Sequence, residues 1–200
     1  MGPPIRKQAG HQKDSGMITV GVDPGLTGAI AAINGEDLCW VEDMPTIDGE
    51  IAIPVLNRLY SVDEYGPWQL THDMPVAIEY VHSMPGQGVS STFKFGKAYG
   101  AMLGYFGARH RITRTAPTEW KTTFRLNGKD KDAARLLAIE LWPNSAETFR
   151  RKKDGGRADA ALIALHHSRQ LRHLPNVAEH HRRMQELRDA PRQPLTKVVG

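Results

Sequence analysis

The sequence predicts an α/β domain in which a five-stranded mixed sheet carries helices on both faces. Two observations predict this class. Three short apolar segments follow one another closely between residues 17 and 43, which is typical of an antiparallel meander. Further on, apolar segments of strand length alternate with helical patterns, which indicates parallel strands joined through helices. We therefore expect one domain over residues 17–172, between a disordered polar tail (1–16) and a basic tail (173–200) that could be part helical.

Five segments rich in apolar and β-branched residues are expected to form the sheet. In chain order they are MITVGV (17–22), GAIAAIN (28–34), LCWVED (38–43), PVAIEYV from Pro75 to about Glu79, and ITRTA (112–116). The turn DPGLTG joins the first two segments. The dipeptide Asn34-Gly35 is a strong hairpin signal between the second and the third.

Five helices are expected where the apolar spacing is helical. They are a helix from Pro54 through Tyr60, a helix over 92–109 capped by Ser90 or Ser91, a short helix from Pro117 that contains Trp120, a helix over 131–142 that Pro143 ends, and a helix over 157–171. Residues 144–153 are expected to be a polar, basic connection.

Three glycines, Gly96, Gly100 and Gly104, share one face of the expected helix over 92–109. Each costs a helix about 0.8–1 kcal/mol relative to Ala. We therefore expect this face to pack closely on the sheet or on a partner helix.

Composition excludes several classes of protein. No apolar run approaches the ~18–20 residues of a membrane span, and residues 1–16 lack the apolar segment of a secretory signal. The single cysteine, Cys39, cannot form an internal disulfide or a thiolate zinc site. This favours a reducing compartment, most simply the cytoplasm of a bacterial or phage-infected cell, without excluding an organelle.

The net charge of +4 hides an uneven distribution. Residues 17–80 hold eleven acidic residues against one basic residue, whereas residues 81–170 hold sixteen basic against seven acidic. Two interpretations stay open. The two halves could complement each other on folding, or an acidic centre that binds cations could lie beside a surface that binds phosphates.

Four carboxylates stand at the ends of expected elements. Asp23 ends the first strand, Glu79 ends the fourth, and Asp154 and Asp159 lie at the start of the last helix. Asp23 could be only a turn residue, and Asp154 or Asp159 only a helix cap. Glu79 is harder to explain structurally, because Glu is depleted in strands and here follows an apolar run. Side chains at strand ends, however, collect where ligands bind to open α/β sheets. Together the four predict a site for Mg²⁺, which prefers oxygen ligands, and two ions ~3.5–4 Å apart could clamp a phosphodiester.

Three motifs carry a resemblance to a known family. The segments DPG (23–25), IEYVHSMPGQG (78–88) and GRADAALIAL (156–165) together resemble Holliday-junction resolvases of the RuvC type, within the ribonuclease H-like fold. The segments MPGQGVSS and AP–W–K (116–121) are similar to the phage-like branch. The resemblance spans about residues 17–170. It implies a homodimeric endonuclease, dependent on Mg²⁺ or Mn²⁺, that cuts branched DNA in recombination or repair.

The resemblance also implies roles for single residues. It makes Asp23, Glu79 and Asp159 catalytic metal ligands. Many members carry Asp or His three residues before the last acid, where this chain has Gly156, so we expect Asp154 to serve as the fourth ligand. In the resembling family a lysine at the position of Lys121 lies near the scissile phosphate. The alternative for Lys121 is a surface lysine without a role.

Basic residues near these motifs are expected to hold the DNA backbone. They are Lys94, Lys97, Lys129, Lys131, Arg150, Arg151, Lys152, Lys153 and Arg157. Met84 or Tyr80 could wedge between bases at the junction, although a packed Met and a core Tyr are the simpler interpretation. The histidines at 166, 167, 173, 180 and 181 are expected to be solvated or hydrogen-bonded, because no tight ligand set accompanies them.

Three other functions stay open. The chain could be a broader nuclease that cuts flaps and forks, or a protein that binds junctions without cutting them because the fourth ligand is lost. The residues Asp23, Gly25 and Thr27 also fit the D-x-G-x-T phosphate loop of sugar-kinase and actin-like ATPases. Those ATPases use two such lobes, and this chain has room for one.

Overall fold

A computed structural model describes residues 17–65, 69–80 and 88–173. Its main sheet has the strand order β3-β2-β1-β6-β7. The strands are β1 (Ile18–Asp23), β2 (Ala29–Asn34), β3 (Asp37–Asp43), β6 (Pro75–Glu79) and β7 (Arg111–Thr115). The pairs β1–β2 and β2–β3 are antiparallel, and β1–β6 and β6–β7 are parallel. The five predicted strands and the mixed character of the sheet are confirmed.

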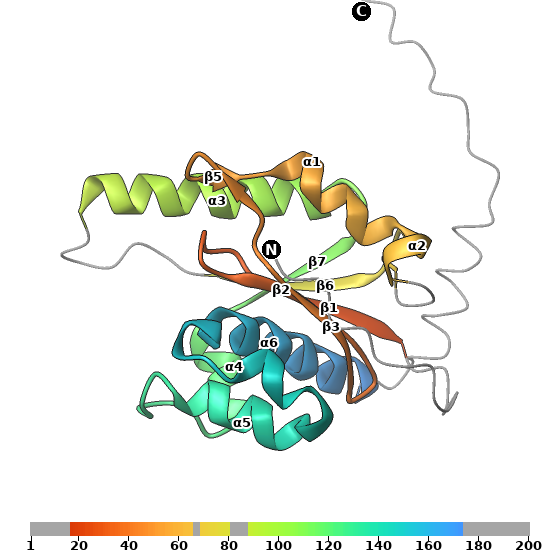
Figure 1. Cartoon of the computed structure of the whole chain (residues 1–200), viewed down its shortest axis with the longest axis vertical. Helices are drawn as coiled ribbons and strands as arrows, with labels where there is room; N and C mark the ends of the chain where they lie inside the picture. The colour runs from red at the N-terminus through yellow and green to blue at the C-terminus, as the bar shows by residue number, and fades with distance from the viewer. Residues whose placement is uncertain (1–16, 66–68, 81–87, 174–200) are drawn as a thin grey trace, which may run out of the picture.

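The helices form a layer on each side of the sheet (Figure 1). On one side lie α1 (Ile53–Leu56), the 3₁₀ helix η1 (Asn57–Tyr60), α2 (Val62–Tyr65) and the long α3 (Val89–Gly107). On the other side lie α4 (Pro117–Thr123), α5 (Ala133–Leu141) and α6 (Gly155–Arg172). Each predicted helix is therefore present, and the expected three-layer α/β architecture is confirmed. No helix within the described ranges is both long and apolar enough to cross a membrane.

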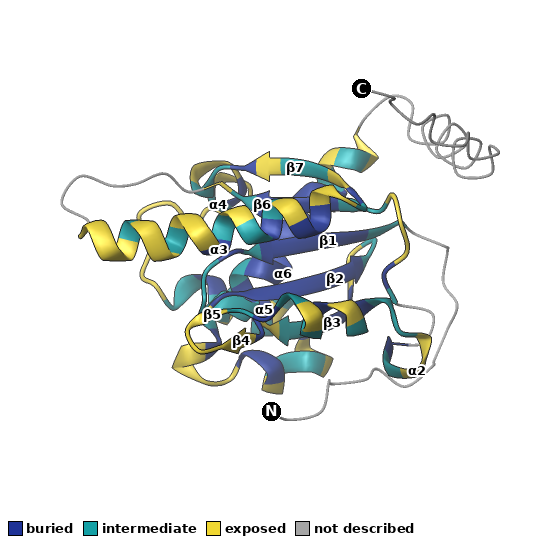
Figure 2. Ribbon diagram, turned by 90° about the horizontal axis from the view of Figure 1, so that it is seen from above, coloured by how far each residue is buried: buried dark blue, intermediate teal, exposed yellow. Residues whose placement is uncertain are grey.

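Helix α6 is the central helix of the molecule, and Figure 2 shows it buried beneath the sheet. Its small residues allow a close approach to β1. Ten of its residues from Ala158 to Ser168 are buried as a result. Gly21 in the middle of β1 makes this approach possible. A Cβ at Gly21 would lie only 2.2 Å from the carbonyl oxygen of Ala160 and 2.4 Å from the amide nitrogen of Ala164. The start of α6 is thereby held against the end of β1.

Several details differ from the expectations. A small hairpin of β4 (Thr46–Ile47) and β5 (Glu50–Ile51) was not predicted. Its turn residues Asp48 and Gly49 both have positive φ, which an Asp-Gly hairpin turn favours. The expected polar connection contains two 3₁₀ helices, η3 (Pro143–Phe149) and η4 (Lys152–Asp154), because Phe149 is buried in the core.

The start and the glycine face of α3 also differ from the expectations. The helix begins at Val89 after Gly88, without a side-chain cap, so capping by Ser90 or Ser91 is wrong. Cβ atoms built at Gly96, Gly100 and Gly104 would meet nothing within 4 Å. The expected packing of this face on the sheet is therefore wrong, and packing on a partner helix stays a prediction. Both terminal tails and most of the loop at 82–90 lie outside the described residues.

Candidate functional site

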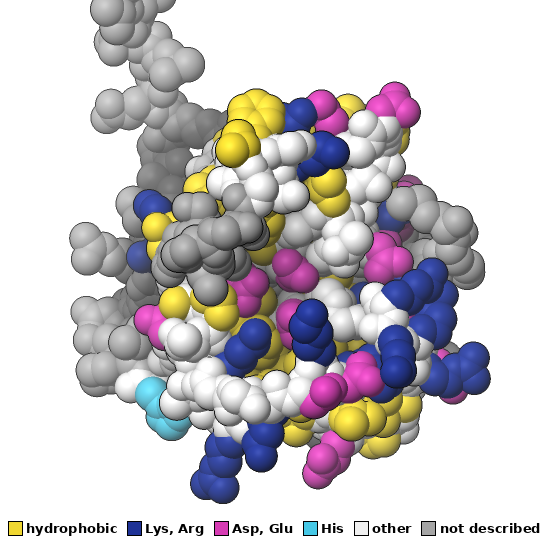
Figure 3. Space-filling model, turned by 90° about the vertical axis from the view of Figure 1, so that its left-hand side faces the viewer, with side chains coloured by type: hydrophobic (Ala, Val, Ile, Leu, Met, Phe, Trp, Pro, Cys, Tyr) yellow, Lys and Arg dark blue, Asp and Glu magenta, His cyan; other side chains and the backbone are white. Residues whose placement is uncertain are grey.

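Three of the predicted acids lie at the carboxyl edge of the parallel strands. Strands β1 and β6 pair with Val22 opposite Ile78, so Asp23 and Glu79, the next residue of each strand, end side by side. Asp159 comes from the first turns of α6, which packs on β1. Figure 3 looks onto this edge and shows Asp and Glu side chains near its centre, bordered by Lys and Arg side chains.

The pKa values of these carboxyls show that they lie close together. Burial and, after it, the charge of Glu79 together raise the pKa of Asp23 to about 6. Burial, together with the charges of Asp23 and Glu79, raises the pKa of Asp159 to about 7. Burial also raises the pKa of Glu79. Lys121 opposes all three shifts, so its ammonium group lies within electrostatic reach of each carboxylate.

The turn after β1 fixes the carboxylate of Asp23. The backbone N–H of Gly25 donates to Asp23 Oδ1 at 3.2 Å, and the N–H of Gly28 donates to the carbonyl of Gly25 at 2.9 Å. Gly28 has no room for a side chain, because a Cβ there would lie 2.2 Å from the carbonyl oxygen of Asp23. The sequence Asp-Pro-Gly with a second glycine thus builds a tight turn around a partly buried acid.

Helix α4 brings two further groups to this edge. The indole N–H of Trp120 donates to Glu79 Oε1 at 2.9 Å, and Trp120 is fully buried. Lys121 Nζ lies 5.1 Å from the centre of the same indole ring. Lys121 therefore lies on α4 beside the tryptophan that binds Glu79, and its place near the scissile phosphate stays a prediction. The bond from Trp120 was not predicted, because its acceptor lies 41 residues earlier in the chain.

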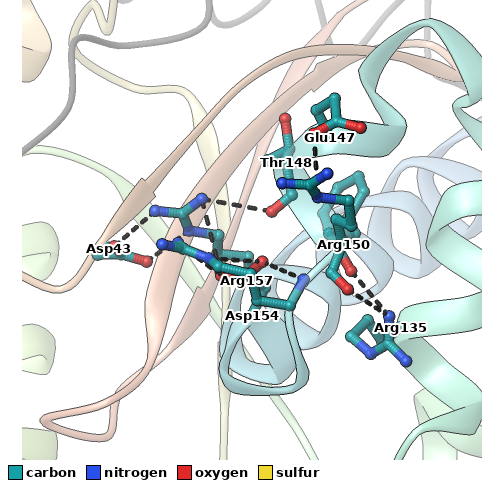
Figure 4. Close-up of polar contacts among 9 residues, drawn as sticks. Asp43, Arg135, Glu147, Thr148, Arg150, Asp154 and Arg157 are labelled. Atoms are coloured by element: carbon teal, nitrogen blue, oxygen red, sulfur yellow. Dashed lines mark hydrogen bonds and ion pairs between the residues drawn. The ribbon is translucent and has the colours of Figure 1, made fainter.

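Asp154 is paired with Arg151 and lies near Arg157, just before α6 (Figure 4). Its side chain is only 2% exposed and is held by Arg151, which donates to Oδ1 from Nη2 at 2.8 Å and to Oδ2 from its backbone N–H at 2.8 Å. Burial alone would raise the pKa of Asp154, but Arg151 and Arg157 hold it below its ordinary value. None of the shifts of Asp23, Glu79 or Asp159 comes from Asp154. The expectation of a fourth metal ligand here does not agree with this arrangement, because Asp154 serves as an ion-pair partner at the start of α6.

Gly156 lies where the expected fourth acid would stand, and it is closed to a side chain. A Cβ at Gly156 would lie 2.6 Å from the carbonyl oxygen of Thr27, 3.0 Å from Cα of Gly28 and 3.2 Å from Asp23 Oδ2. The backbone of α6 therefore touches the turn after β1 directly. An acid at position 156 would need that turn to move.

The chemistry of the three carboxylates suits a divalent cation, but their arrangement is not a formed coordination site. Mg²⁺ and Mn²⁺ favour oxygen donors, and three partly buried carboxylates, whose charges raise the pKa values of Asp23 and Asp159, would gain from a cation between them. Within residues 17–65, 69–80 and 88–173, however, no three His, Cys, Asp or Glu side chains are arranged to hold a metal ion as they stand. The side chains would have to turn towards one another to bind one.

The basic residues predicted to contact DNA fall into two groups. Four are engaged in ion pairs: Lys97 with Glu50, Arg150 with Glu147, Arg151 with Asp154, and Arg157 with Asp43. Five are exposed lysines that pair with no acid among the described residues: Lys94, Lys129, Lys131, Lys152 and Lys153. Arg157 donates to both oxygens of Asp43 at 2.6 Å and ties β3 to α6 (Figure 4). Its predicted role in DNA binding would require this pair to open.

The remaining predicted residues have varied surroundings. Tyr80 is 38% exposed beside Tyr99, with ring centres 6.1 Å apart, whereas Met84 lies outside the described residues. His166 and His167 are buried on α6, and burial lowers the pKa of each. Nδ1 of His166 shares a 2.8 Å hydrogen bond with the hydroxyl of Thr123 on α4.

Comparisons with known proteins place the fold. No family model matches the chain. Over 89 residues, which are 44% of its length, this chain is 37% identical to "Holliday junction resolvase MOC1, chloroplastic" of Chlamydomonas reinhardtii. The match spans about a tenth of that protein's length.

Solved structures of RuvC are also similar to this chain. The structure "T. thermophilus RuvC in complex with Holliday junction substrate" matches 78% of this chain and 95% of its own, with 21% identity and a TM-score of 0.53. A second structure, "Thermus thermophilus RuvC structure", matches 78% of this chain and 96% of its own, at 22% identity and a TM-score of 0.48. The first likeness confirms the predicted ribonuclease H-like fold, and the algal relative and RuvC together confirm the predicted resemblance to Holliday-junction resolvases.

Proposed function

We propose that this chain is a divalent-metal-dependent endodeoxyribonuclease that resolves four-way DNA junctions in recombination or repair. One observation carries the proposal: Asp23, Glu79 and Asp159 gather at the carboxyl edge of β1 and β6. There the charges of neighbouring carboxylates raise the pKa values of Asp23 and Asp159. The names of the algal relative and of the RuvC structure support a junction as the substrate.

We assign the metal ion to these three carboxylates, with Mg²⁺ or Mn²⁺ as the ion. When bound, such an ion supplies Lewis acidity towards a phosphodiester. The expectation of two ions per site stays a prediction, and Asp154 would have to leave its pair with Arg151 to act as a fourth ligand. Cation binding would displace the protons that Asp23 and Asp159 hold near pH 6 to 7.

Lys121 is proposed to act on the phosphate. Its ammonium group lies within electrostatic reach of all three acids and is held near the face of Trp120. A fixed positive charge there would offset negative charge on the oxygen that leaves when the phosphodiester is cut. Glu79 accepts the indole N–H of Trp120 on Oε1, and its Oε2 accepts no hydrogen bond from the described residues, which leaves it available to a ligand.

We propose that α3 forms a homodimer with a second copy of the chain. Its glycine face is open, and two large apolar side chains near its start are strongly exposed, Val89 at 87% and Phe93 at 70%. Close contact between two such helices would offset the free-energy cost of the glycines in α3. A two-fold dimer would present two sites to the two strands of a junction.

The proposal is tested on a synthetic four-way junction with Mg²⁺. Wild type should cut it into two nicked duplexes, and Asp23→Asn should lower the rate by at least 100-fold. Asp48→Asn removes an exposed acid in the β4–β5 turn and should cut as wild type does. Equal cleavage by wild type and Asp23→Asn would reject the site. Faster cleavage of flaps or forks than of junctions would favour the broader nuclease.

A second function, junction binding without cleavage, is favoured by one observation. The position of the expected fourth acid is Gly156, and the nearest alternative, Asp154, is bound to Arg151. This function predicts tight junction binding with no cleavage in Mg²⁺ or Mn²⁺. Restoring an acid at Gly156 is a poor test, because its Cβ would collide with the carbonyl of Thr27. Cleavage by the wild-type chain is the decisive measurement.

The alternative ATPase function and the cellular location need tests of their own. Absence of ATP binding in calorimetry would exclude the phosphate-loop ATPase function. A cytoplasmic location, favoured by the single cysteine, stays a prediction, and the algal relative is named as a chloroplast protein.

A further inference from the structure

The indole of Trp120 contacts two charged groups of the candidate site at once. Its N–H donates to Glu79 Oε1 at 2.9 Å, and Lys121 Nζ lies 5.1 Å from its ring centre. An indole has a partly positive edge and a partly negative face. The edge therefore attracts a carboxylate and the face attracts an ammonium group. One ring thus interacts favourably with an anion and a cation that belong to different elements.

Packing fixes the position of this ring. Trp120 is completely buried and belongs to the core cluster beneath the sheet, together with Ala77 of β6 and the apolar residues of α6. A ring packed on all sides cannot turn to follow a moving carboxylate. The hydrogen bond therefore orients the side chain of Glu79 rather than that of Trp120.

Helix α4, which carries Trp120, is held at both ends. At its start the side chain of Glu119 accepts a hydrogen bond from the backbone N–H of Ala116 at 2.8 Å. At its end Thr123 shares a hydrogen bond with His166 of α6. Helix α6 also carries Asp159, two turns before His166. The indole is thereby positioned relative to the acids of both β6 and α6.

We propose that Trp120 is a positioning residue of the candidate site: its N–H orients the carboxylate of Glu79 for cation binding, and its ring face holds Lys121 beside the acids. The role in cleavage rests on the proposed function, whereas the orientation of Glu79 does not. Because the free oxygen of Glu79 is the one available to a cation, loss of the indole N–H should weaken cation binding. Loss of a group that orients a metal ligand typically costs about 10–100-fold in metal affinity or activity.

The chain offers a matched control in Trp142. Its indole N–H also donates to an oxygen at 2.9 Å, the backbone carbonyl of Glu36, and its side chain is also buried, at 6% exposure. Trp120→Phe and Trp142→Phe therefore each remove one buried indole and one hydrogen bond of equal length. Only Trp120→Phe removes a contact with the candidate site.

Three measurements on the full chain test the proposal. Calorimetry with Mn²⁺ should show affinity about 10–100-fold weaker in Trp120→Phe than in Trp142→Phe. Junction cleavage should fall by a similar factor in Trp120→Phe alone, while junction binding without divalent metal stays within about twofold of wild type. In ¹H–¹⁵N spectra, assigned by single Trp→Phe substitutions, Glu79→Ala should shift the indole resonance of Trp120 and leave that of Trp142 in place.

The outcomes separate this proposal from the proposed function. An unchanged Trp120 resonance in Glu79→Ala, or equal Mn²⁺ affinities of Trp120→Phe and Trp142→Phe, would overturn the positioning role. If wild type cuts no junction, the proposed function fails, whereas a shifted resonance and weaker Mn²⁺ binding would still support the orientation of Glu79. If Trp120→Phe does not fold, the spectrum of Glu79→Ala decides.

Discussion

Neutralising Asp159 should stabilise the metal-free protein at alkaline pH. The carboxyl of Asp159 is partly buried and lies near two further acids, Asp23 and Glu79, with only Lys121 to oppose them. Its pKa is raised from 3.8 to about 7. Asp159→Asn keeps the shape of the side chain and removes the charge.

The magnitude follows from linkage between protonation and folding. Between pH 3.8 and about 7 the folded chain binds a proton at Asp159 that the unfolded chain releases, so stability falls as the pH rises through this window. A tenfold change in proton affinity corresponds to about 1.4 kcal/mol, which gives an upper bound of about 4 kcal/mol at pH 8. The carboxyls titrate together and the amide needs hydrogen bonds of its own, so we expect a gain of about 2 kcal/mol. For a domain of this size that raises Tm by about 4–8 °C.

Thermal denaturation in EDTA at pH 4, 6 and 8 measures the effect. The gain of Asp159→Asn over wild type should be near zero at pH 4 and should grow up to pH 8. Asp48→Asn, an exposed matched control, should show no such growth. Added Mg²⁺ should raise Tm more in wild type than in Asp159→Asn, since binding to the folded state stabilises it. A loss of stability in Asp159→Asn at pH 8, or a gain independent of pH, would refute the reasoning.

Three further predictions concern structure. Asp154→Asn should lower the free energy of unfolding in urea by about 2 kcal/mol, because Arg151 loses a charged acceptor. The folded variant should keep its Mn²⁺ affinity, and a 10-fold loss of that affinity would mean that Asp154 is a metal ligand. Phe93→Glu should weaken dimerisation at least 10-fold in sedimentation analysis, and an unchanged dimer would reject the α3 interface. Gly21→Ala should cost at least about 2 kcal/mol in urea unfolding, because its Cβ would overlap α6, and a cost below about 0.5 kcal/mol would contradict the close packing.

The strands and the three acids could be predicted because their signals are local. A buried strand is a short apolar run, and an acid directly after such a run must lie at the edge of the sheet. Asp23 and Glu79 are of this kind, and parallel pairing of β1 with β6 brings them together. The contact of Asp159 with them depends on Gly21, whose lack of a side chain lets α6 lie on β1.

The partners of charged and polar side chains could not be predicted in the same way. Asp154 stands near the start of a helix, as a metal ligand or a cap would, and only the fold shows that Arg151 binds it. Trp120 and Glu79 are 41 residues apart, and nothing local links an indole to one particular carboxylate. Such choices depend on which side chains the fold brings within 3 Å.

The first interpretation of the uneven charge, in which the two halves complement each other on folding, describes part of the molecule, and the second stays a prediction. Acids of the N-terminal half pair with bases of the C-terminal half: Glu36 with Arg169 and Arg172, Asp43 with Arg157, and Glu50 with Lys97. Three of the eleven acids in residues 17–80 are thereby paired with bases from later in the chain. Asp23 and Glu79 belong to the same acidic half, but the charge that opposes theirs comes from Lys121 alone. Neither Asp23 nor Glu79 forms an ion pair with an arginine of the described residues.

This pairing should limit the salt dependence of the proposed DNA binding. Nine neutralised phosphates would give a slope of log affinity against log salt of about −8, at ~0.9 for each phosphate. Of the nine predicted basic contacts, four already pair with acids, which leaves five exposed lysines and a slope of about −4 to −5 per protomer. Anisotropy with a labelled junction and Asp23→Asn, in Mg²⁺ at rising KCl, measures it. Lys152→Ala with Lys153→Ala should reduce the slope by about 2, whereas Arg157→Ala should leave it unchanged. A slope near −8, or a clear effect of Arg157→Ala, would mean that the ion pairs open when DNA binds.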